Sequence, residues 1–271
     1  MSACYFIIQS ENKGVGTVIV LDERLAAAAQ LVRPGSRVAD VGTDHGYLIA
    51  QLLLDRKAVF GYACDIHPKP LEKAAETLKQ YGLQDCSALF LGDGLQGLLA
   101  EQVDDVVIAG MGGDMILHIL DTADWKNSSQ RFVLQPMTKV HELRAGLYQR
   151  GYEILQERAS IVKGFAYAVM QVRWCGQRCD VTDLFARVGL MPQTGSEEAR
   201  IYLEKQAQIA KKIAEGLKKS NTKRNEYKKY YELAREIVWG RHDWFGSNRW
   251  GWTGFCIWFL RRSMNWEIWW N

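Results

Sequence analysis

The fold is indicated by one segment, Val38-Ala39-Asp40-Val41-Gly42-Thr43-Asp44-His45-Gly46-Tyr47-Leu48. Its first residues are typical of a buried β-strand, its middle is a turn with two glycines, and its last residues begin a helical pattern. In open α/β sheets, ligands bind outside the carboxyl ends of the strands. The loop after residue 41 is therefore the expected edge of a ligand cleft.

Short β-rich runs and helical patterns alternate on both sides of this segment. The expected strands are residues 37–41, 60–65, 88–91, 106–109 and 132–135, and the expected helices are residues 22–32, 47–54, 71–81, 114–120 and 140–150. Because parallel strands need crossover helices, this alternation predicts a doubly wound α/β sheet. Two further strands, 152–159 and 167–174, are joined by residues 160–166 without a helix, so one strand must enter the sheet antiparallel.

The composition is that of an ordinary globular protein. The chain has 271 residues, 48% of them apolar and 24% charged, and its formal charge of +3 permits a nucleic-acid partner without requiring one. We find no signal-peptide pattern and no apolar run of about 18–20 residues, so we expect a cytoplasmic protein without a membrane partner. Cys175 and Cys179 have no second pair to complete a zinc site, so no metal is expected.

The chain divides into three regions: an α/β domain (residues 21–180), a helical domain (183–238) and a tryptophan-rich tail of unknown role (239–271). A linker is expected around residues 182–194. All the acids and glycines of the predicted cleft precede residue 150. We therefore expect the α/β domain to fold and to bind its ligand without the helical domain.

The helical domain combines apolar side chains at helical spacing with an excess of basic residues. Residues 196–219 and 222–238 predict an antiparallel, coiled-coil-like helical hairpin. The basic excess is greatest at its tip, and the candidate contacts to nucleic-acid phosphates there are Lys218, Lys219, Lys223 and Arg224. A solvated charged face explains the same pattern, so both interpretations stay open.

The glycine turn does not suit a nucleotide phosphate. Gly42 and Gly46 are separated by four positions, whereas dinucleotide-binding loops need the GxGxxG spacing, and no Walker lysine follows. Asp44 also lies where a phosphate would sit, and a carboxylate repels an anion but attracts a cation. The sulfonium and ammonium groups of S-adenosylmethionine match that sign.

Further polar residues follow the neighbouring strands. Asp65 ends the second strand, where an acid can accept hydrogen bonds from ribose hydroxyls, and Asp93 follows the third, where it can accept the adenine amino group. A single loop aspartate is more often a cap or turn residue, but capping explains three acids after three successive strands poorly. After the fourth strand, the glycines of IAGMGG allow a substrate base to approach the backbone.

Four motifs, DVGTDHGYL, GDGL, IAGMGG and LQP, occur in this order ahead of the basic hairpin. Together they resemble the bacterial tRNA (adenine-22-N1)-methyltransferases of the TrmK type, over residues 21–238. The resemblance implies a class I Rossmann-like, S-adenosylmethionine-dependent methyltransferase domain with sheet order 3-2-1-4-5-7-6, and a coiled-coil-like domain that helps to hold tRNA. Met137 stands where the family commonly has asparagine, and this departure concerns the positioning of the base.

The resemblance also implies roles for single residues: Asp44 lies beside the target base, and Arg24 touches cofactor or RNA. With the cleft argument, it gives two sets of candidates. The candidate cofactor-binding residues are Asp40, Gly42, Thr43, His45, Asp65, Ile66, Asp93, Gly94, Ala109 and Gly110. The candidate substrate-binding residues are Arg24, Met111, Gly112, Gly113, Gln135, Pro136, Lys218, Lys219, Lys223 and Arg224.

The expected reaction is methyl transfer to adenine N1. N1 carries an in-plane lone pair and needs no prior deprotonation, so positive charge develops on the base during transfer. Asp44, as the catalytic residue, would stabilise this charge by accepting a hydrogen bond from the 6-amino group, with His45 as the alternative base. Two other functions stay open: a methyltransferase for a small molecule, and an RNA-binding protein without catalysis.

Overall fold

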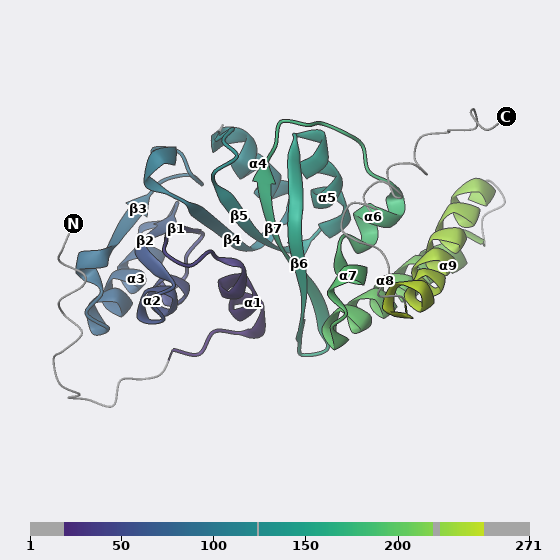
Figure 1. The fold of residues 1–271 in the computed structure, drawn as a ribbon, viewed down its shortest axis with the longest axis horizontal. Coiled ribbons are helices and arrows are strands. Elements are labelled where there is room, and N and C mark those ends of the chain that lie inside the picture. The colour runs from purple at the N-terminus through teal and green to yellow at the C-terminus, as the bar shows by residue number, and fades with distance from the viewer. Residues whose placement is uncertain (1–18, 124, 219–222, 247–271) are drawn as a thin grey trace.

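The computed structural model describes residues 19–123, 125–218 and 223–246 (Figure 1). Its strands are β1 (Ser36–Val41), β2 (Ala58–Asp65), β3 (Ser87–Leu91), β4 (Asp105–Gly112), β5 (Arg131–Thr138), β6 (Tyr152–Val162) and β7 (Phe165–Trp174). They form one seven-stranded sheet in the order β3-β2-β1-β4-β5-β7-β6. Strand β7 is antiparallel to β5 and to β6, while the other neighbours are parallel. The expected mixed sheet and its order are confirmed.

The helices of the α/β domain follow the predicted alternation. They are α1 (Glu23–Leu31), α2 (Tyr47–Leu54), α3 (Pro68–Gln80), α4 (Gly113–Ala123) and α5 (Val140–Gln149). Asp22 caps α1, because its carboxylate accepts hydrogen bonds from the backbone N–H groups of Arg24 (3.0 Å) and Leu25 (2.9 Å). Short 3-10 turns, Gln84–Cys86 and Ala100–Gln102, precede β3 and β4.

The helices cover both faces of the sheet, and the alternation of side chains along the strands separates two cores. On one face, α1 and α2 pack on Val107 of β4 and Val133 of β5. On the other face, α4 and α5 pack on Phe132 and Leu134 of β5. This pattern follows from the period of two in a strand, which sends neighbouring side chains to opposite faces. Both faces are therefore covered, as parallel strands require.

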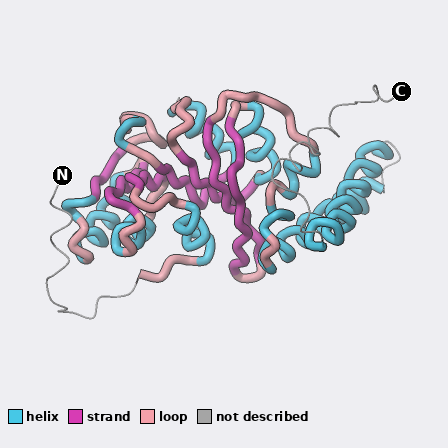
Figure 2. Tube along the Cα trace, viewed as in Figure 1, coloured by secondary structure: helices cyan, strands magenta, loops and turns pink. Residues whose placement is uncertain are grey.

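The β6–β7 hairpin is longer than the sequence predicts, and Figure 2 shows it projecting past the other strands. Residues 160–166 were expected to form a loop. Instead Ile161 pairs with Ala166 and Val162 pairs with Phe165, so only Lys163 and Gly164 form the turn. β-branched residues at 161 and 162 favour the extended backbone, which explains the extra pairs.

Two short helices occupy the expected linker. They are α6 (Asp183–Val188) and α7 (Met191–Thr194), and Thr182 caps α6 through its hydroxyl, which accepts a hydrogen bond from the Phe185 N–H at 3.1 Å. The sequence of residues 182–194 was read as a connection, because each helix is too short to show a period. Within the described residues, no helix combines the length and the apolar character needed to cross a membrane.

The helical domain is a hairpin of α8 (Glu197–Lys218) and α9 (Arg224–Gly246), which pack against each other. Helix α9 is longer than predicted and includes residues 239–246, whereas residues 247–271 and Lys219 lie outside the described residues. Ala199, Tyr202 and Leu203 of α8 are buried in the same core as the sheet. The expectation that the α/β domain folds without the hairpin stays a prediction, and its test must allow for the part of the core that α8 covers.

A buried cluster, which we call the joint, connects the two parts through Arg144 of α5, Glu157 of β6 and Tyr202 of α8. The Arg144 guanidinium donates to Glu157 Oε1 at 2.9 Å and to the Tyr202 hydroxyl at 3.2 Å. It also donates to the backbone carbonyls of Ala186 and Arg187 in α6. Burial lowers the pKa of Arg144, but the carboxylate of Glu157 outweighs this and raises it. The joint therefore holds α5, α6 and α8 against β6.

Candidate active site

The carboxyl ends of β1, β2 and β4 form one edge of the sheet, which we call the rim. Asp40, on β1, lies between Ala63 of β2 and Val107 of β4. Its side chain is buried, with 7% of the residue exposed. Burial raises the pKa of Asp40 to about 6, a hydrogen bond with Thr43 opposes the rise, and the charge of Asp65 adds to it. Asp40 and Asp65 thus lie close enough to interact.

The glycine turn is held against β2 by its backbone. The N–H groups of Gly42 and Thr43 both donate to the carbonyl of Cys64, at 2.9 and 3.0 Å. Gly46 then begins α2 with a positive φ of 68°, and its N–H donates to Thr43 Oγ1 at 3.2 Å. A Cβ at Gly46 would lie 3.0 Å from the Cβ of Ala74 in α3, so glycine suits both the backbone angle and the close approach of α3.

The second and third acids meet through the backbone. The N–H of Gly92 donates to the carbonyl of Asp65 at 3.0 Å, which brings the Gly92-Asp93-Gly94 turn to the end of β2. Asp65 Oδ1 accepts a hydrogen bond from the His67 N–H at 2.7 Å, and Oδ2 has no hydrogen bond within the described residues. Ile66 and Asp93 are exposed. Two carboxylates with free oxygens therefore face solvent beside Asp40.

Asp44 lies on the outer side of the glycine turn. Its side chain is 79% exposed, and its nearest charged neighbours are His45, with 3.5 Å between Nε2 and Oδ2, and Lys73, with 3.9 Å between Nζ and Oδ1. The Lys73 ammonium also lies 3.4 Å from His45 Nε2. The His45 ring stacks on Tyr47 with 5.2 Å between ring centroids. The Asp44 carboxylate is therefore held near a cation but remains accessible.

The IAGMGG motif passes directly from β4 into α4. Gly110 has a positive φ of 80°, and its N–H donates to Gln135 Oε1 at 3.1 Å. Gln135 is fully buried, and its Nε2 donates to the carbonyl of Pro136 at 3.0 Å. Ala109, Met111 and Gly112 are partly exposed, whereas Gly113 is buried. The Gln135 side chain thus fixes the Gly110 backbone and uses both of its polar atoms within the protein.

Arg24 reaches the same edge of the sheet from α1. Its guanidinium lies 2.8 Å from Met137 Sδ and stacks over the ring of Tyr167, 5.5 Å from the centroid, and it also pairs with Asp22. Met137 follows the Gln135-Pro136 pair on β5 and is 38% exposed. The structure therefore brings Arg24 next to the end of the fifth strand, although more than 100 residues separate Arg24 from Met137.

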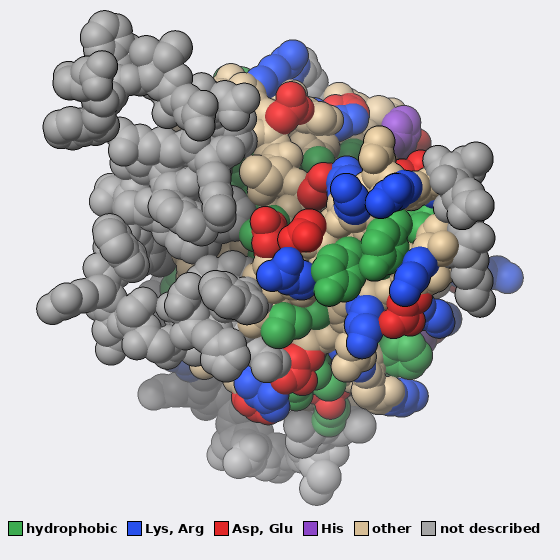
Figure 3. Space-filling view, turned by 90° about the vertical axis from the view of Figure 1, so that its right-hand side faces the viewer, with side chains coloured by type: hydrophobic (Ala, Val, Ile, Leu, Met, Phe, Trp, Pro, Cys, Tyr) green, Lys and Arg blue, Asp and Glu red, His purple; other side chains and the backbone are tan. Residues whose placement is uncertain are grey.

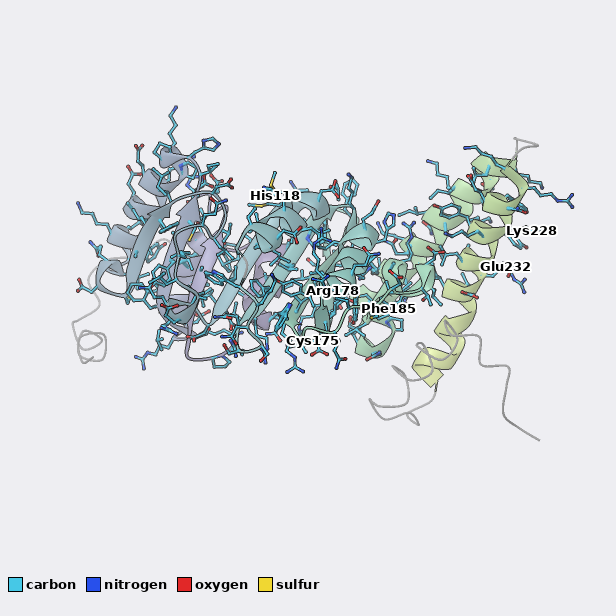
Figure 4. All side chains as sticks on the ribbon, turned by 90° about the horizontal axis from the view of Figure 1, so that it is seen from above. His118, Cys175, Arg178, Phe185, Lys228 and Glu232 are labelled. Carbon is cyan, nitrogen blue, oxygen red and sulfur yellow. The ribbon has the colours of Figure 1, made fainter. Side chains whose placement is uncertain are left out.

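The structure gathers the candidates of the glycine turn, Asp65, Asp93, Arg24 and the IAGMGG motif along one edge of the sheet. The basic candidates lie elsewhere: Lys218, Lys223 and Arg224 are exposed on the hairpin. Figure 4 labels Lys228 and Glu232 on α9, which lies apart from the sheet. Within the described part of the chain, no group of three or more His, Cys, Asp or Glu residues is arranged to hold a metal ion.

Sequence reasoning missed two side chains at the rim, Lys73 and Tyr167. Lys73 approaches Asp44 because α3 packs against the start of α2, and Tyr167 approaches Arg24 because β7 inserts beside β5. Neither belongs to a motif. Only the tertiary fold places them, so no local signal in the sequence identifies them.

Comparison with known proteins indicates which class of protein has this fold and this rim. The family described as Methyltransferase domain matches residues 21–170. The tRNA (adenine(22)-N(1))-methyltransferase of Bacillus subtilis (strain 168) is 31% identical over 192 residues, which are 69% of this chain and 80% of that protein. The crystal structure of the B. subtilis m1A22 tRNA methyltransferase TrmK aligns with a TM-score of 0.71 at 26% identity, covering 82% of this chain and 100% of that one.

Two similar structures contain the cofactor or its product. M. capricolum TrmK in complex with S-adenosyl-homocysteine aligns with a TM-score of 0.68 at 27% identity, covering 83% of this chain and 99% of that chain. Streptococcus pneumoniae Sp1610 in complex with S-adenosyl-L-methionine aligns with a TM-score of 0.69 at 25% identity, covering 81% and 100%. Fold and rim together define a methyltransferase that uses S-adenosylmethionine. More narrowly, the chain belongs to the family of tRNA (adenine(22)-N(1))-methyltransferases.

The rim fits S-adenosylmethionine chemically. Asp65 keeps one carboxylate oxygen free to accept a ribose hydroxyl, and Asp93 is exposed beside it. Asp40 supplies a buried carboxyl group next to them, and a carboxylate attracts the cationic groups of the cofactor. In the turn after Asp40, Gly42 is partly exposed, whereas Thr43 and Gly46 are buried.

Proposed function

We propose that this chain transfers a methyl group to N1 of adenine 22 in tRNA, with Asp65 and Asp93 holding the cofactor and Asp44 beside the base. The observation that carries the proposal is the ordered row of acids along the rim, in a chain that covers 80% of a curated tRNA (adenine(22)-N(1))-methyltransferase. S-adenosylmethionine supplies the methyl group. A cytoplasmic location is part of this proposal, because a tRNA substrate is available there.

On the cofactor side, each acid has a separate task. Asp65 has one oxygen committed to the His67 N–H, so its other oxygen is available for the ribose. Asp93 follows the next strand. The hydrogen bond from the Gly92 N–H to the Asp65 carbonyl keeps Asp93 close to Asp65. Asp40 lies between them and the turn, where its charge favours a cationic ligand.

On the substrate side, Asp44 supplies the acceptor. Adenine N1 attacks with its own lone pair, so the base becomes positively charged and its 6-amino group becomes a stronger donor. The exposed Asp44 carboxylate makes no contact shorter than 3.5 Å with a described charged group, so it can accept that hydrogen bond. Lys73 and His45 hold the carboxylate from the side, and His45 remains the alternative base.

The hairpin supplies candidate phosphate contacts. Some of its cations are already paired: Lys229 contacts Asp183 of α6 at 2.6 Å and Arg235 contacts Glu232 at 3.4 Å, while Lys223 lies 3.9 Å from Glu226. Lys218 and Arg224 have no ion pair within the described residues. Figure 3 shows the end of the molecule that carries the hairpin, where Lys and Arg side chains lie among acidic and apolar ones. The free cations at the turn are therefore the best candidates for RNA contact.

The direct test is methylation of unmodified tRNA, followed by nucleoside analysis and mapping of the modified position. We expect one equivalent of 1-methyladenosine at position 22, and none in a tRNA in which guanosine replaces adenosine 22. Turnover that needs no tRNA would instead identify a small-molecule methyltransferase. A chain that binds tRNA but not S-adenosylmethionine in calorimetry would be an RNA-binding protein without catalysis.

The role of the hairpin is tested by the salt dependence of tRNA binding. The logarithm of the affinity should fall linearly with the logarithm of salt concentration, by about 0.7 to 0.9 per phosphate contact. Replacing Lys218, Lys223 and Arg224 by glutamine should flatten this slope by about two to three. The matched control replaces Lys229, which is already paired with Asp183, and should change the slope less. An unchanged slope in the triple variant would mean that the hairpin is a solvated charged face.

A further inference from the structure

A trough of mixed polar and apolar lining lies between α1 and the edge strand β6. Its volume is about 670 Å³, and it is lined by one face of α1 (residues 23–30), by residues 155–161 of β6 and by residues 190–198 around α7. Figure 1 shows α1 on one side of β6 and α7 with the start of α8 on the other. This volume is within the range of about 300–1,000 Å³ that is typical of ligand sites.

The lining of the trough is rich in side chains that can both donate and accept hydrogen bonds. Gln30, Gln156 and Gln193 supply carboxamides, and all three are exposed. Gln156 uses its amide nitrogen on Gln171 at 3.1 Å, and its oxygen has no hydrogen bond within the described residues. Carboxamides bind nucleobase edges because they present a donor next to an acceptor.

The charged side chains of the trough indicate whether the base or the phosphate of an RNA nucleotide would bind there. Glu23 and Glu198 are exposed carboxylates, and Arg158 is the single cation among the residues that line the trough. None of the three forms an ion pair within the described residues. Carboxylates repel phosphate but accept hydrogen bonds from the amino groups of bases, and a guanidinium stacks on a base plane. The trough therefore suits a base rather than a phosphate.

Ser160 supplies an independent observation. The residue is 4% exposed and lines the trough, and its hydroxyl has no hydrogen-bond partner in the part of the chain that the structure describes. A buried hydroxyl without a partner is unfavourable, but its oxygen is covered by the protein, so a ligand in the trough reaches it only after the surrounding side chains move. Ser160 also pairs across the hairpin with Tyr167, on which Arg24 stacks. This pairing connects the trough to Arg24, the candidate substrate-binding residue that reaches the end of β5.

An extended peptide would fit this site less well. Although β6 is the last strand of the sheet, α7 and α8 pack against it, so a peptide could not pair freely with its edge. We infer that the trough binds a second nucleobase of the tRNA, splayed out of its stack near the methylated adenine. This inference rests on the proposed function, and it names a subsite for the same substrate.

The test combines a trough variant with altered tRNAs. The variant carries Arg158→Met and Gln193→Met, two exposed residues whose replacement should not disturb the core, and the matched control carries Arg178→Met and Gln102→Met, which lie outside the trough. Each protein is assayed with tRNAs that carry a single abasic ribose at successive positions around adenosine 22. The trough variant should raise the KM for intact tRNA roughly tenfold, with kcat and cofactor affinity unchanged.

The decisive result is whether the trough variant and the abasic tRNA raise the KM independently of each other. At one position, the abasic tRNA should raise the KM of the unmodified protein as much as the trough variant does, and combining the two should add nothing. The inference would be overturned if the increases in KM from the variant and from the abasic tRNA multiply at every position. It would also be overturned if the salt dependence of tRNA binding falls by about one in the variant, because that result would assign Arg158 to a phosphate. If the unmodified protein does not methylate intact tRNA, the proposed function itself fails, which the same assay reveals separately.

Discussion

Glu157 in the joint and Asp44 at the rim are both carboxylates, but their surroundings differ completely. The side chain of Glu157 is fully buried and accepts hydrogen bonds from Arg144 and from the backbone N–H of Leu190. The side chain of Asp44 is 79% exposed, and the ammonium nitrogen of Lys73 is 3.9 Å from its carboxylate. A charge whose bonding capacity is used inside the protein stabilises structure, whereas one with free lone pairs can act on a ligand.

The largest expected effect is on stability, and it comes from the joint. Arg144→Met would leave the Glu157 carboxylate buried without its partner. We expect the free energy of unfolding to fall by about 3–5 kcal/mol in urea denaturation. The matched control is Arg150→Met, which breaks the exposed pair with Asp121 and should cost about 0–1 kcal/mol.

A second variant shows whether charge, rather than shape, causes this loss. In Arg144→Met combined with Glu157→Leu, both charges are replaced by apolar side chains, and much of the lost stability should return. Equal losses in Arg144→Met and in the exposed control would mean that the joint contributes no more than a surface pair.

The next largest effect is expected on turnover, from Asp44→Asn. An amide cannot carry the charge that stabilises the developing cation, so kcat should fall by about 10²- to 10⁴-fold. The dissociation constant for S-adenosylmethionine should change little, because Asp44 lies outside the group of Asp40, Asp65 and Asp93. Asp55→Asn, at the opposite end of α2, is the control. Single-turnover methylation at the unmodified rate would exclude a catalytic role for Asp44.

The third effect is on cofactor binding, from Asp65→Ala. This change removes the free oxygen assigned to the ribose and should raise the dissociation constant for S-adenosylmethionine by about 10- to 100-fold in calorimetry. Asp85→Ala, an exposed acid in the turn before β3, should leave the constant unchanged. A constant unaffected by Asp65→Ala would contradict the ribose assignment.

The rim could be predicted from the sequence because its signals are local. Asp40 and Asp65 lie at the ends of recognisable strands and Asp93 follows one, and parallel strands place their carboxyl ends at one edge. Predicting the sheet required only the alternation of strands and helices, together with the hairpin after residue 150. The order of the strands came from the resemblance to a family, since alternation alone allows several orders.

The joint could not be predicted in the same way. Arg144 and Tyr202 are 58 positions apart, and each looks like an ordinary residue of an amphipathic helix. Charged residues are seldom fully buried, so nothing in residues 140–150 marks Arg144 as a core residue. The same limit applies to α8: its sequence shows an apolar face, but not that the core of the sheet covers this face.

The smallest expected effect concerns Asp40. Its carboxyl group is buried, like that of Glu157 in the joint, but it lies at the rim, like that of Asp44. Its pKa is raised to about 6, above its ordinary value of 3.8, so between these values the folded protein binds more protons than the unfolded chain. Stability without cofactor should therefore fall as the pH rises from about 4 to 6.

A cationic cofactor favours the charged form of Asp40, so the affinity for the cofactor should rise about tenfold from pH 5 to pH 7. In Asp40→Asn, affinity should start lower and both trends should be lost. Calorimetric titrations of the two proteins at several pH values check this, and an equal pH dependence in both would assign the titration to another group.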